Sequence, residues 1–125
     1  MDKSHLRRQV AELFIIRASG YNLDSQRLYP SLELSNSNLK RLLEQGVGGV
    51  ILLGGTVTEL EIRCQVLTKW AGKPILLCAD VEEGIGQRFN GGERFVPPMG
   101  IAQIYQNDPE LGIYMAEKYG FFLGK

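Results

Sequence analysis

Apolar residues along this chain fall into two patterns: short continuous runs, and residues spaced three or four positions apart. Continuous runs occupy positions 13–16, 50–53 and 75–79, and each is bounded by polar residues, glycine or proline. Such runs predict three short buried strands, and the run at 50–53 is typical of a strand covered on both faces.

The sequence between these runs predicts helices, because apolar residues recur at helical spacing behind residues that favour helix starts. Ser4 is the predicted cap of a first helix and Ser37 that of a second, which Gly46 ends. A third helix starts at a capping box from Thr58 to Glu61, whose hydroxyl and carboxylate each bond an orphan amide. The predicted apolar faces are Leu6 and Val10, then Leu39, Leu42 and Leu43, then Ile62, Val66, Leu67 and Trp70.

Two segments lack any such period and are predicted to be long loops. Residues 19–37 are rich in serine and asparagine, and residues 80–107 contain one Gly-Gly and one Pro-Pro pair. A last helix then opens at Asp108, with Pro109 in its first turn. Its apolar stripe is predicted to face the core and consists of Leu111, Met115, Tyr119 and Phe122.

The order strand, helix, strand, helix, strand, loop, helix is typical of α/β proteins, in which right-handed crossovers join parallel strands. Two architectures fit: an open doubly wound sheet, or the opening part of a TIM (β/α)8 barrel. A complete barrel typically takes about 250 residues, whereas this chain has 125. We therefore expect residues 1–125 to form one incomplete barrel domain, and the uninterrupted last helix favours a segment of a longer protein.

Composition narrows the classes of partner and location. Lys and Arg together number 14, as do Asp and Glu, so no basic excess indicates nucleic-acid binding. No apolar stretch approaches the length of a membrane span, and the N-terminus does not resemble a signal peptide, so we expect a cytoplasmic protein. Cys64 and Cys78 are expected to be buried free thiols, and His5 is the sole histidine, so no metal or organic cofactor is predicted.

The end of the third predicted strand carries the most informative chemistry. Asp80 stands at the carboxyl end of that strand, where parallel α/β folds bind their ligands. If the extended run continues, Glu82 lies on the same face as Asp80 and Glu83 points elsewhere. A buried carboxylate needs a partner, and Arg88 is near enough to serve. Together a carboxylate and a guanidinium suit sugar hydroxyls, because one accepts hydrogen bonds and the other donates them.

Two alternatives to a sugar site remain open on spacing alone. Asp80 and Arg88 fit a structural salt bridge equally well. The nearby glycines, Gly84 and Gly86, allow either a tight turn or the close approach of a ligand. Elsewhere, the Gly-Gly-Thr segment at 54–56 can present amides to a phosphate, although it lacks the lysine of a phosphate-binding loop. A small phosphate- or nucleotide-binding module is therefore the alternative function.

The segment ILLCADVEEGIGQRF, followed by GG, PPMG and DPEL, resembles the N-terminal domain of family 3 glycoside hydrolases, the β-glucosidases and β-N-acetylhexosaminidases. That family carries Asp-x-Glu-x-Gly-x-x-x-Arg-Phe after a strand. VGGVILLGG also resembles the family's second strand, and VAELFII its first, with Ala-Glu in place of Gly-Gln. The motif positions are occupied here by Asp80, Glu82, Gly84, Arg88 and Phe89.

The resemblance implies a barrel domain whose sugar site lies at the carboxyl ends of the strands. Asp80 matches an aspartate that binds hydroxyls of the non-reducing terminal sugar, and Arg88 matches an arginine that supports this pocket. Glu82 matches an acidic position expected to support the pocket from behind, and the three form the predicted substrate-binding set. The implied partner is a small carbohydrate, with no nucleic acid, membrane or cofactor, and a longer parent chain supplies the rest of the barrel.

No catalytic residue is predicted in this chain. Retaining glycosidases need a nucleophilic carboxylate and an acid/base about 5 Å apart. The family's nucleophilic aspartate, its acid/base and its Lys-His-Phe-Pro-Gly segment lie further along, and none has a match here. The predicted function is a segment of a retaining exo-β-glycosidase acting on a β-glucoside or β-N-acetylglucosaminide. Alone, the chain is expected to be inactive, and a truncated remnant without function is a further alternative.

Overall fold

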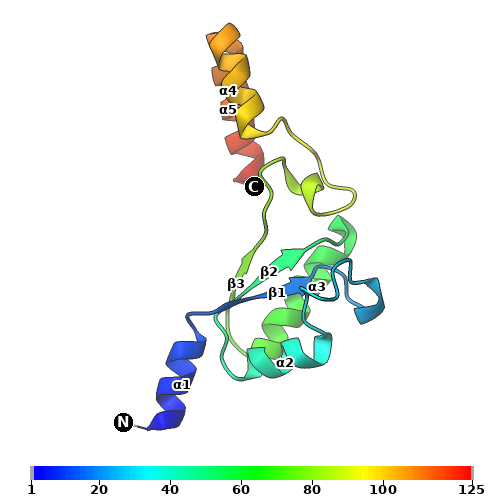
Figure 1. Cartoon of the computed structure of the whole chain (residues 1–125), viewed down its shortest axis with the longest axis vertical. Helices are drawn as coiled ribbons and strands as arrows, with labels where there is room; N and C mark the ends of the chain where they lie inside the picture. Colours follow the sequence, from blue (N-terminus) through cyan, green and yellow to red (C-terminus); the bar gives the residue numbers. More distant parts are fainter. Residues whose placement is uncertain (1, 125) are drawn as a thin grey trace. The chain divides into compact units, whose positions relative to one another are not determined.

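The structure is a computed structural model and describes residues 2–124. The chain divides after Ala79 into two compact units, both drawn in Figure 1. Residues 2–79 are called here the sheet unit and residues 80–124 the hairpin unit. Because the boundary falls before Asp80, all three predicted substrate-binding residues belong to the hairpin unit.

Three parallel strands form the centre of the sheet unit: β1 (Ile15–Ser19), β2 (Gly49–Leu53) and β3 (Leu76–Cys78). Their order is β1-β2-β3, with Val50 paired to Ile16 on one side and to Leu77 on the other. The predicted parallel α/β arrangement is confirmed. Three strands leave the sheet open, so these residues form no barrel by themselves.

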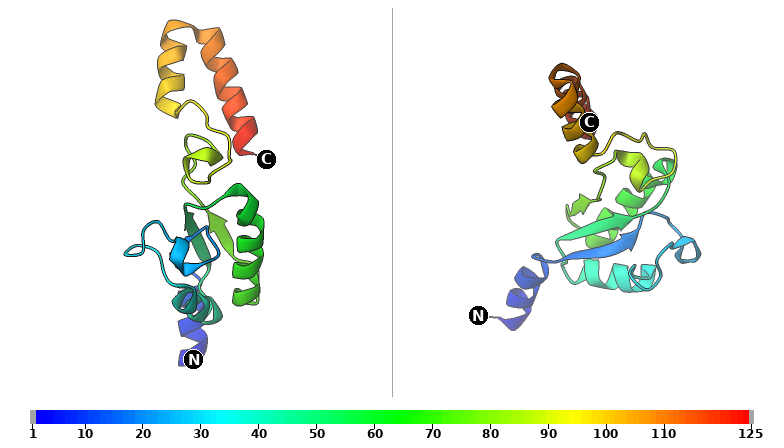
Figure 2. Two further views of the ribbon diagram at one scale, coloured as in Figure 1. Left: turned by 90° about the vertical axis from the view of Figure 1, so that its right-hand side faces the viewer. Right: turned by 45° about the horizontal axis from the view of Figure 1, so that its top comes forward.

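Helices α2 (Asn36–Glu44) and α3 (Val57–Ala71) lie side by side and cover one face of the sheet (Figures 1 and 2). The opposite face is more open, with Ile15 49% and Leu76 59% exposed. In β2 itself, Ile51 and Leu53 are half-buried on that face, so the expectation that β2 is covered on both faces is confirmed only in part. The covered face and its helices bury Ala18, Val50, Leu52, Leu39, Leu43 and Leu67.

The first strand begins later than its apolar run predicts. Of positions 13–16, the first two are 83% and 58% exposed, and β1 starts only at Ile15. Pairing explains this start, because the Phe14 carbonyl accepts the amide hydrogens of Gly48 and Gly49, both at 3.2 Å. The ladder therefore starts where the second strand offers donors, and not where the first apolar residue stands.

Each predicted N-cap of the sheet unit lies two residues past the observed one. In place of Ser4, Ser37 and Thr58, the caps of α1 (Lys3–Ala11), α2 and α3 are Asp2, Ser35 and Thr56. The predicted residues remain close to the helix ends: in α2 and α3 their hydroxyl oxygens lie 3.2 and 3.1 Å from the observed caps. A pair of polar residues, two positions apart, thus marks each of these two helix starts.

Helix α3 is rotated from its predicted orientation: of the four predicted apolar residues, Leu67 is buried, and Val66 and Trp70 are only half-buried. The buried residues are Arg63, Leu67 and Ala71, at positions i, i+4 and i+8. Ile62, a predicted core residue, is 56% exposed. The helix ends at Gly72, which has a left-handed φ of +64°. The polar atoms that Arg63 binds account for this rotation of the helix.

The hairpin unit contains α4 (Pro98–Asn107) and α5 (Pro109–Leu123). The last helix, α5, is confirmed, whereas the prediction of one long loop over 80–107 is wrong because it missed α4 and a short 3-10 turn, η2 (Ile85–Gln87). Pro98 occupies the first turn of α4, where a proline lacks only an amide hydrogen that would have no partner. A Pro-Pro pair here starts a helix instead of interrupting one.

Asp108 alone joins the two helices of the hairpin unit. Its amide donates to the Ile104 carbonyl at 2.8 Å, which closes α4, and its carboxylate accepts the Leu111 amide at 3.0 Å, which opens α5. The helices approach closely where a Cβ on Gly112 would lie 2.5 Å from the Cα of Tyr105. The short joint and the bare glycine together produce a tight antiparallel pair.

The apolar stripe predicted on α5 is confirmed only in part. Met115 and Tyr119 are half-buried, but Leu111 and Phe122 remain 46% and 42% exposed. Phe95 packs against this helix, with its ring centroid 5.7 Å from that of Tyr119 and 5.8 Å from that of Phe122. These aromatic contacts tie the segment that carries the predicted site to α5.

Candidate functional site

Asp80 and Arg88 lie together in the hairpin unit. The Arg88 Nε donates to the Asp80 carbonyl at 3.2 Å, and Nη2 lies 3.6 Å from the carboxylate oxygen Oδ2. One guanidinium thus contacts both the backbone and the side chain of a single residue. The side chains are 33% and 52% exposed, so this pair adds only about 0–1 kcal/mol to stability and leaves the carboxylate accessible to a ligand.

Glu82 lies on a turn and not on an extension of the strand. Strand β3 ends at Cys78, and the Gly84 amide donates to the Val81 carbonyl at 2.9 Å. The extended run that would align Glu82 with Asp80 is therefore interrupted, and the prediction of a shared strand face is wrong. Glu82 is exposed on this turn.

The glycines of this segment serve its own packing. Gly84 has a φ of +85°, and a Cβ there would lie 2.7 Å from the carbonyl oxygen of Glu93. The amide of Gly86 donates to the same oxygen at 2.7 Å, and Phe95 donates to the Glu83 carbonyl at 2.7 Å. Tight turning, one of the two predicted uses, is confirmed. The space that a side chain would take is filled by the segment itself.

Phe89, the residue after Arg88, holds the backbone of this segment in place. Phe89 is 3% exposed, its amide donates to the Ile85 carbonyl at 3.0 Å, and its carbonyl accepts the Gly92 amide at 3.1 Å. Burying Phe89 restricts the backbone from which Arg88 extends toward Asp80. The result is a positioned donor beside an exposed acceptor, which is the pair of groups that binds vicinal hydroxyls.

The Gly-Gly-Thr segment at 54–56 forms the turn and cap that precede α3. Gly54 and Gly55 have φ angles of +68° and +136°, and the Gly54 carbonyl accepts the Gly20 amide at 3.0 Å. Thr56 Oγ1 accepts the Glu59 amide at 3.2 Å and donates to the Glu59 carboxylate at 2.8 Å. A carboxylate at this helix start repels a phosphate, so the geometry favours a capping turn over the alternative phosphate site.

A buried arginine in the sheet unit is the polar feature that sequence reasoning missed. Arg63 is 2% exposed, donates through Nε to the Ser19 carbonyl at 2.9 Å and through Nη1 to Asn36 Oδ1 at 2.9 Å. Its guanidinium lies 5.8 Å from the ring centroid of Trp70. Burial lowers the pKa of Arg63, and the nearby carboxylates, chiefly that of Asp24, oppose this effect.

The loop between β1 and α2 is fastened to this arginine. Asn36, which accepts from Arg63, also donates its backbone amide to the Asp24 carboxylate at 2.8 Å. Glu33 is 2% exposed, and its Oε2 accepts the Tyr29 amide at 2.9 Å. Its Oε1 is buried without a hydrogen-bond partner among residues 2–124. The predicted loop is therefore ordered by polar contacts, some of them partly buried, that join its beginning to its end.

The two cysteines and the acidic side chains of the described residues lie apart from one another in small groups. Cys64 and Cys78 are free thiols, as predicted, but are half-buried and not fully buried. Burial raises the pKa of the Cys64 thiol, against the opposing charge of Arg63. Within residues 2–124, no cluster of three or more histidine, cysteine or acidic side chains could hold a metal ion. Over the same residues, every helix is too short or too polar to cross a membrane.

Comparison with known proteins places the chain among glycosidase relatives. No family model matches it. A beta-hexosaminidase from Tolumonas auensis is 36% identical over 78 residues, which are 60% of this chain and 23% of that protein. A beta-hexosaminidase from Xylella fastidiosa is 31% identical over 97 residues, which are 72% of this chain and 28% of that protein. A beta-hexosaminidase from Thiobacillus denitrificans is 30% identical over 95 residues, which are 73% of this chain and 26% of that protein.

These matches span only about a quarter of the length of the curated relatives. By sequence, therefore, the chain is similar to part of the beta-hexosaminidases, in agreement with the resemblance to glycoside hydrolase family 3.

Proposed function

We propose that this chain supplies part of the terminal-sugar pocket of a retaining exo-β-glycosidase. The substrate class is a β-N-acetylglucosaminide or a β-glucoside, and the name shared by the curated relatives favours the former. The proposal rests chiefly on one observation: Asp80 and Arg88 form a solvent-accessible pair directly after a parallel strand. Ligand sites of parallel α/β folds form at that end of the strands.

Each proposed role follows from the chemistry of its side chain. Asp80 accepts hydrogen bonds from two hydroxyls of the terminal sugar, since an ionised carboxylate offers two oxygens and no donor. Arg88 keeps that carboxylate oriented and offers its remaining donors to the sugar. Glu82 lies on the turn two residues further on and supports the electrostatics of the pocket without touching the sugar.

The bond-breaking groups are proposed to come from elsewhere in the complete enzyme. A retaining mechanism needs a nucleophilic carboxylate and an acid/base about 5 Å apart on opposite sides of the glycosidic bond. Asp80 is already engaged by Arg88, and we assign neither catalytic role to it nor to Glu82 or Glu83. In the complete protein, further strand–helix units continue the open sheet into a (β/α)8 barrel.

Sugar binding by the chain itself tests this proposal. We would titrate the isotope-labelled 125-residue protein with N-acetylglucosamine, and separately with glucose, and follow backbone amide shifts by NMR. Saturable shifts are expected around Asp80, Gly84 and Arg88. Asp80→Asn should abolish them, because the amide replaces one acceptor oxygen by a donor.

A matched control separates sugar binding from a general loss of negative charge. Glu93→Gln removes the same charge from another exposed residue of the hairpin unit and should leave the shifts intact. Equal loss in both variants, or no saturable shift with either sugar, would reject Asp80 as a sugar ligand. Hydrolysis of aryl β-glycosides by the 125-residue chain at enzyme-like rates would reject the assignment of the catalytic groups to other parts of the protein.

A further inference from the structure

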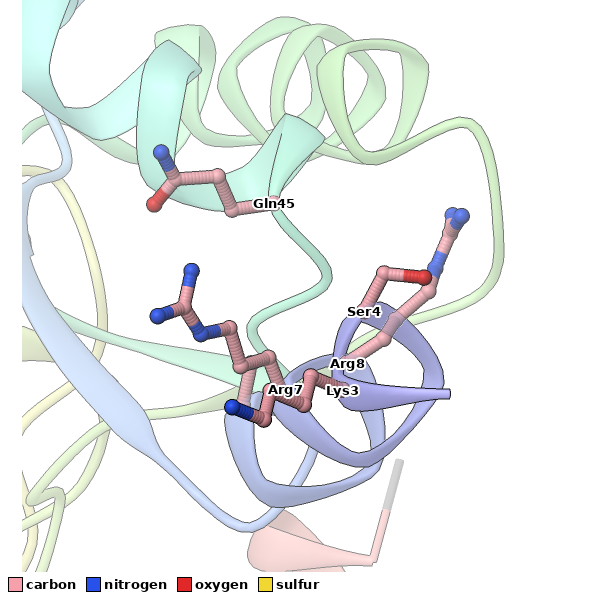
Figure 3. A pocket seen from close by; sticks show the side chains of 6 residues that line it. Lys3, Ser4, Arg7, Arg8 and Gln45 are labelled. Atoms are coloured by element: carbon pink, nitrogen blue, oxygen red, sulfur yellow. The ribbon is translucent and has the colours of Figure 1, made fainter. Parts of the chain in front are cut away.

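A cationic pocket lies between α1 and the end of α2, away from any residue used in the proposed function. The pocket has a volume of about 470 Å³ and is lined by Lys3, Ser4, Arg7, Arg8, Ala11 and Gln45. Figure 3 shows Arg7 and Gln45 pointing toward one another across the opening, with Ser4 and Arg8 together on another side. Five of the six residues share one face of α1, because they are spaced three, four or seven positions apart.

No carboxylate lines this pocket, and the acidic groups nearest in sequence are engaged elsewhere. Asp2 caps α1 by accepting the Ser4 amide at 3.0 Å. Glu12 accepts a hydrogen bond from Lys73 at 2.7 Å, and Glu44 pairs with Lys40 at 3.8 Å. Among residues 2–124, Lys3, Arg7 and Arg8 form no ion pair of their own. Three cationic side chains therefore line the pocket without an ion pair among the described residues, although the charge of Arg8 also acts on Glu12.

Arg8 lies in the last turn of α1, where the helix dipole favours a cation, but Lys3 and Arg7 do not serve the helix that carries them. Lys3 occupies the first turn of α1, where the helix dipole disfavours a cation, and that turn has no acidic residue. Lys3 and Arg7 are also like charges one turn apart, an arrangement that destabilises a helix. A bound anion would offset both unfavourable interactions.

Contacts join α1 and the end of α2, the two elements that line the pocket. Gly46, next to Gln45, has a φ of +106°, and a Cβ there would lie 2.9 Å from Cγ of Arg8. The bare backbone thus makes room for the aliphatic part of Arg8. Lys73 joins both sides, donating to Glu12 just beyond α1 at 2.7 Å and to the Gly46 carbonyl at 3.1 Å. These contacts join the two sides of the pocket, although α1 buries none of its own residues.

We propose that this pocket binds a phosphate group. Two guanidinium groups and one ammonium offer charged donors, and the hydroxyl of Ser4 and the amide of Gln45 add neutral ones. Guanidinium forks match the paired oxygens of a phosphate. The pocket, of about 470 Å³, has room for a phosphate carried by a small molecule or by a lipid headgroup. Exposed Leu6 and Val10 on the neighbouring face of α1 make the headgroup a real second source.

Calorimetric titration of the full 125-residue chain with inorganic pyrophosphate, at low ionic strength, tests the site. Saturable binding is expected, and the double variant R7Q/R8Q should weaken it by roughly tenfold or more, because two charged hydrogen-bond donors are lost. The control K69Q/K118Q removes the same charge from exposed positions of α3 and α5 and should bind like the unaltered chain. Circular dichroism shows whether each variant is folded.

A second arm identifies the source of the phosphate. Co-sedimentation with phosphatidylglycerol vesicles, compared with phosphatidylcholine vesicles, reports headgroup binding. Vesicle binding that R7Q/R8Q loses, without pyrophosphate binding, assigns the site to a lipid headgroup. Pyrophosphate binding alone assigns it to a free phosphorylated molecule. Absence of saturable binding to both probes, or equal weakening by the control variant, would overturn the proposal.

Discussion

Two long connecting segments differ in whether their charged residues are buried or exposed to solvent. The loop of residues 20–35 in the sheet unit surrounds buried charges, with Arg63 and Glu33 each 2% exposed. The segment of residues 80–97 in the hairpin unit buries an aromatic side chain, Phe89, and leaves Asp80 and Arg88 partly in solvent. Buried charges with fixed partners stabilise a conformation, whereas accessible charges on an anchored backbone remain available to a ligand. Burial and partners thus distinguish a structural charge from a candidate binding group.

Removing the buried arginine should break the first segment and produce the largest effect. Arg63→Met leaves Glu33 without a nearby buried cation and removes the hydrogen bonds to Ser19 and Asn36. We expect the free energy of unfolding in urea to fall by about 3–5 kcal/mol. The matched substitution Arg88→Met should cost only about 0–1 kcal/mol, since that guanidinium is partly exposed. Equal losses in the two variants would refute the contrast.

Crowding the second segment should produce the next largest effect. Gly84→Ala puts a Cβ 2.7 Å from a backbone oxygen at a φ of +85°, whereas Gly91, with a φ of +87°, has nothing within 4 Å. The conformational cost of alanine, about 1–2 kcal/mol, is the same at both positions. The clash should add about 1–3 kcal/mol at Gly84 alone. Thermal unfolding of the two variants measures the difference, and similar melting temperatures would show that the packing of residues 84–86 against 92–95 is loose.

Neutralising one carboxylate in each segment should change the free energy of unfolding by smaller amounts, which still differ between the two segments. Asp80→Asn removes a charge that is 52% exposed, so the free energy of unfolding should change by less than about 1 kcal/mol. Glu33→Gln alters a carboxylate that is 2% exposed, and should cost about 1–3 kcal/mol. Urea unfolding of both variants is the measurement. A larger loss for Asp80→Asn would identify its pair with Arg88 as a structural salt bridge.

The smallest expected effect on stability comes from the ion pair of Glu12 and Lys73, and it depends on pH. The hydrogen bond from Lys73, and secondarily its charge, lower the pKa of Glu12 below its ordinary 4.5. A carboxyl whose pKa is lower in the folded state contributes stability above its unfolded pKa and loses it as pH falls through the folded pKa. The unaltered chain should therefore exceed Lys73→Met in free energy of unfolding by an amount that shrinks as the pH falls from about 6 to about 3. An advantage that stays constant or grows over this range would contradict the sign.

Regular elements were largely predictable because their signals are local. Apolar period and capping residues indicated α2, α3 and α5, and the continuous runs indicated the strands. Cap positions failed by two residues because each helix start carries two residues able to cap, such as Thr56 and Thr58. Local sequence does not decide between them, since either residue of each pair has the side chain that a cap requires. Helix α4 was missed because a Pro-Pro pair favours a loop as readily as the first turn of a helix.

The candidate site was predictable to the extent that its contacts are short in sequence. Asp80 and Arg88 are eight residues apart, and their contact follows the expectation from spacing. Glu82 did not, because the turn closed by Val81 and Gly84 replaces the extended backbone assumed for it. Arg63 was beyond reach for a different reason. Arginine is seldom buried, and its hydrogen-bond partners lie 27 and 44 residues away, so only the tertiary fold reveals its role.

The single-residue joint at Asp108 has a consequence for evolution and protein engineering. Asp108 makes both the hydrogen bond that ends α4 and the one that starts α5. After an insertion at this position, one residue could no longer make both hydrogen bonds. Length variation and inserted tags are tolerated at exposed loop tips whose backbone makes few bonds, and this tip does not qualify. We expect deletions and insertions among related chains to avoid it, and proteases to spare it, so the two helices should be inherited as one unit of constant length.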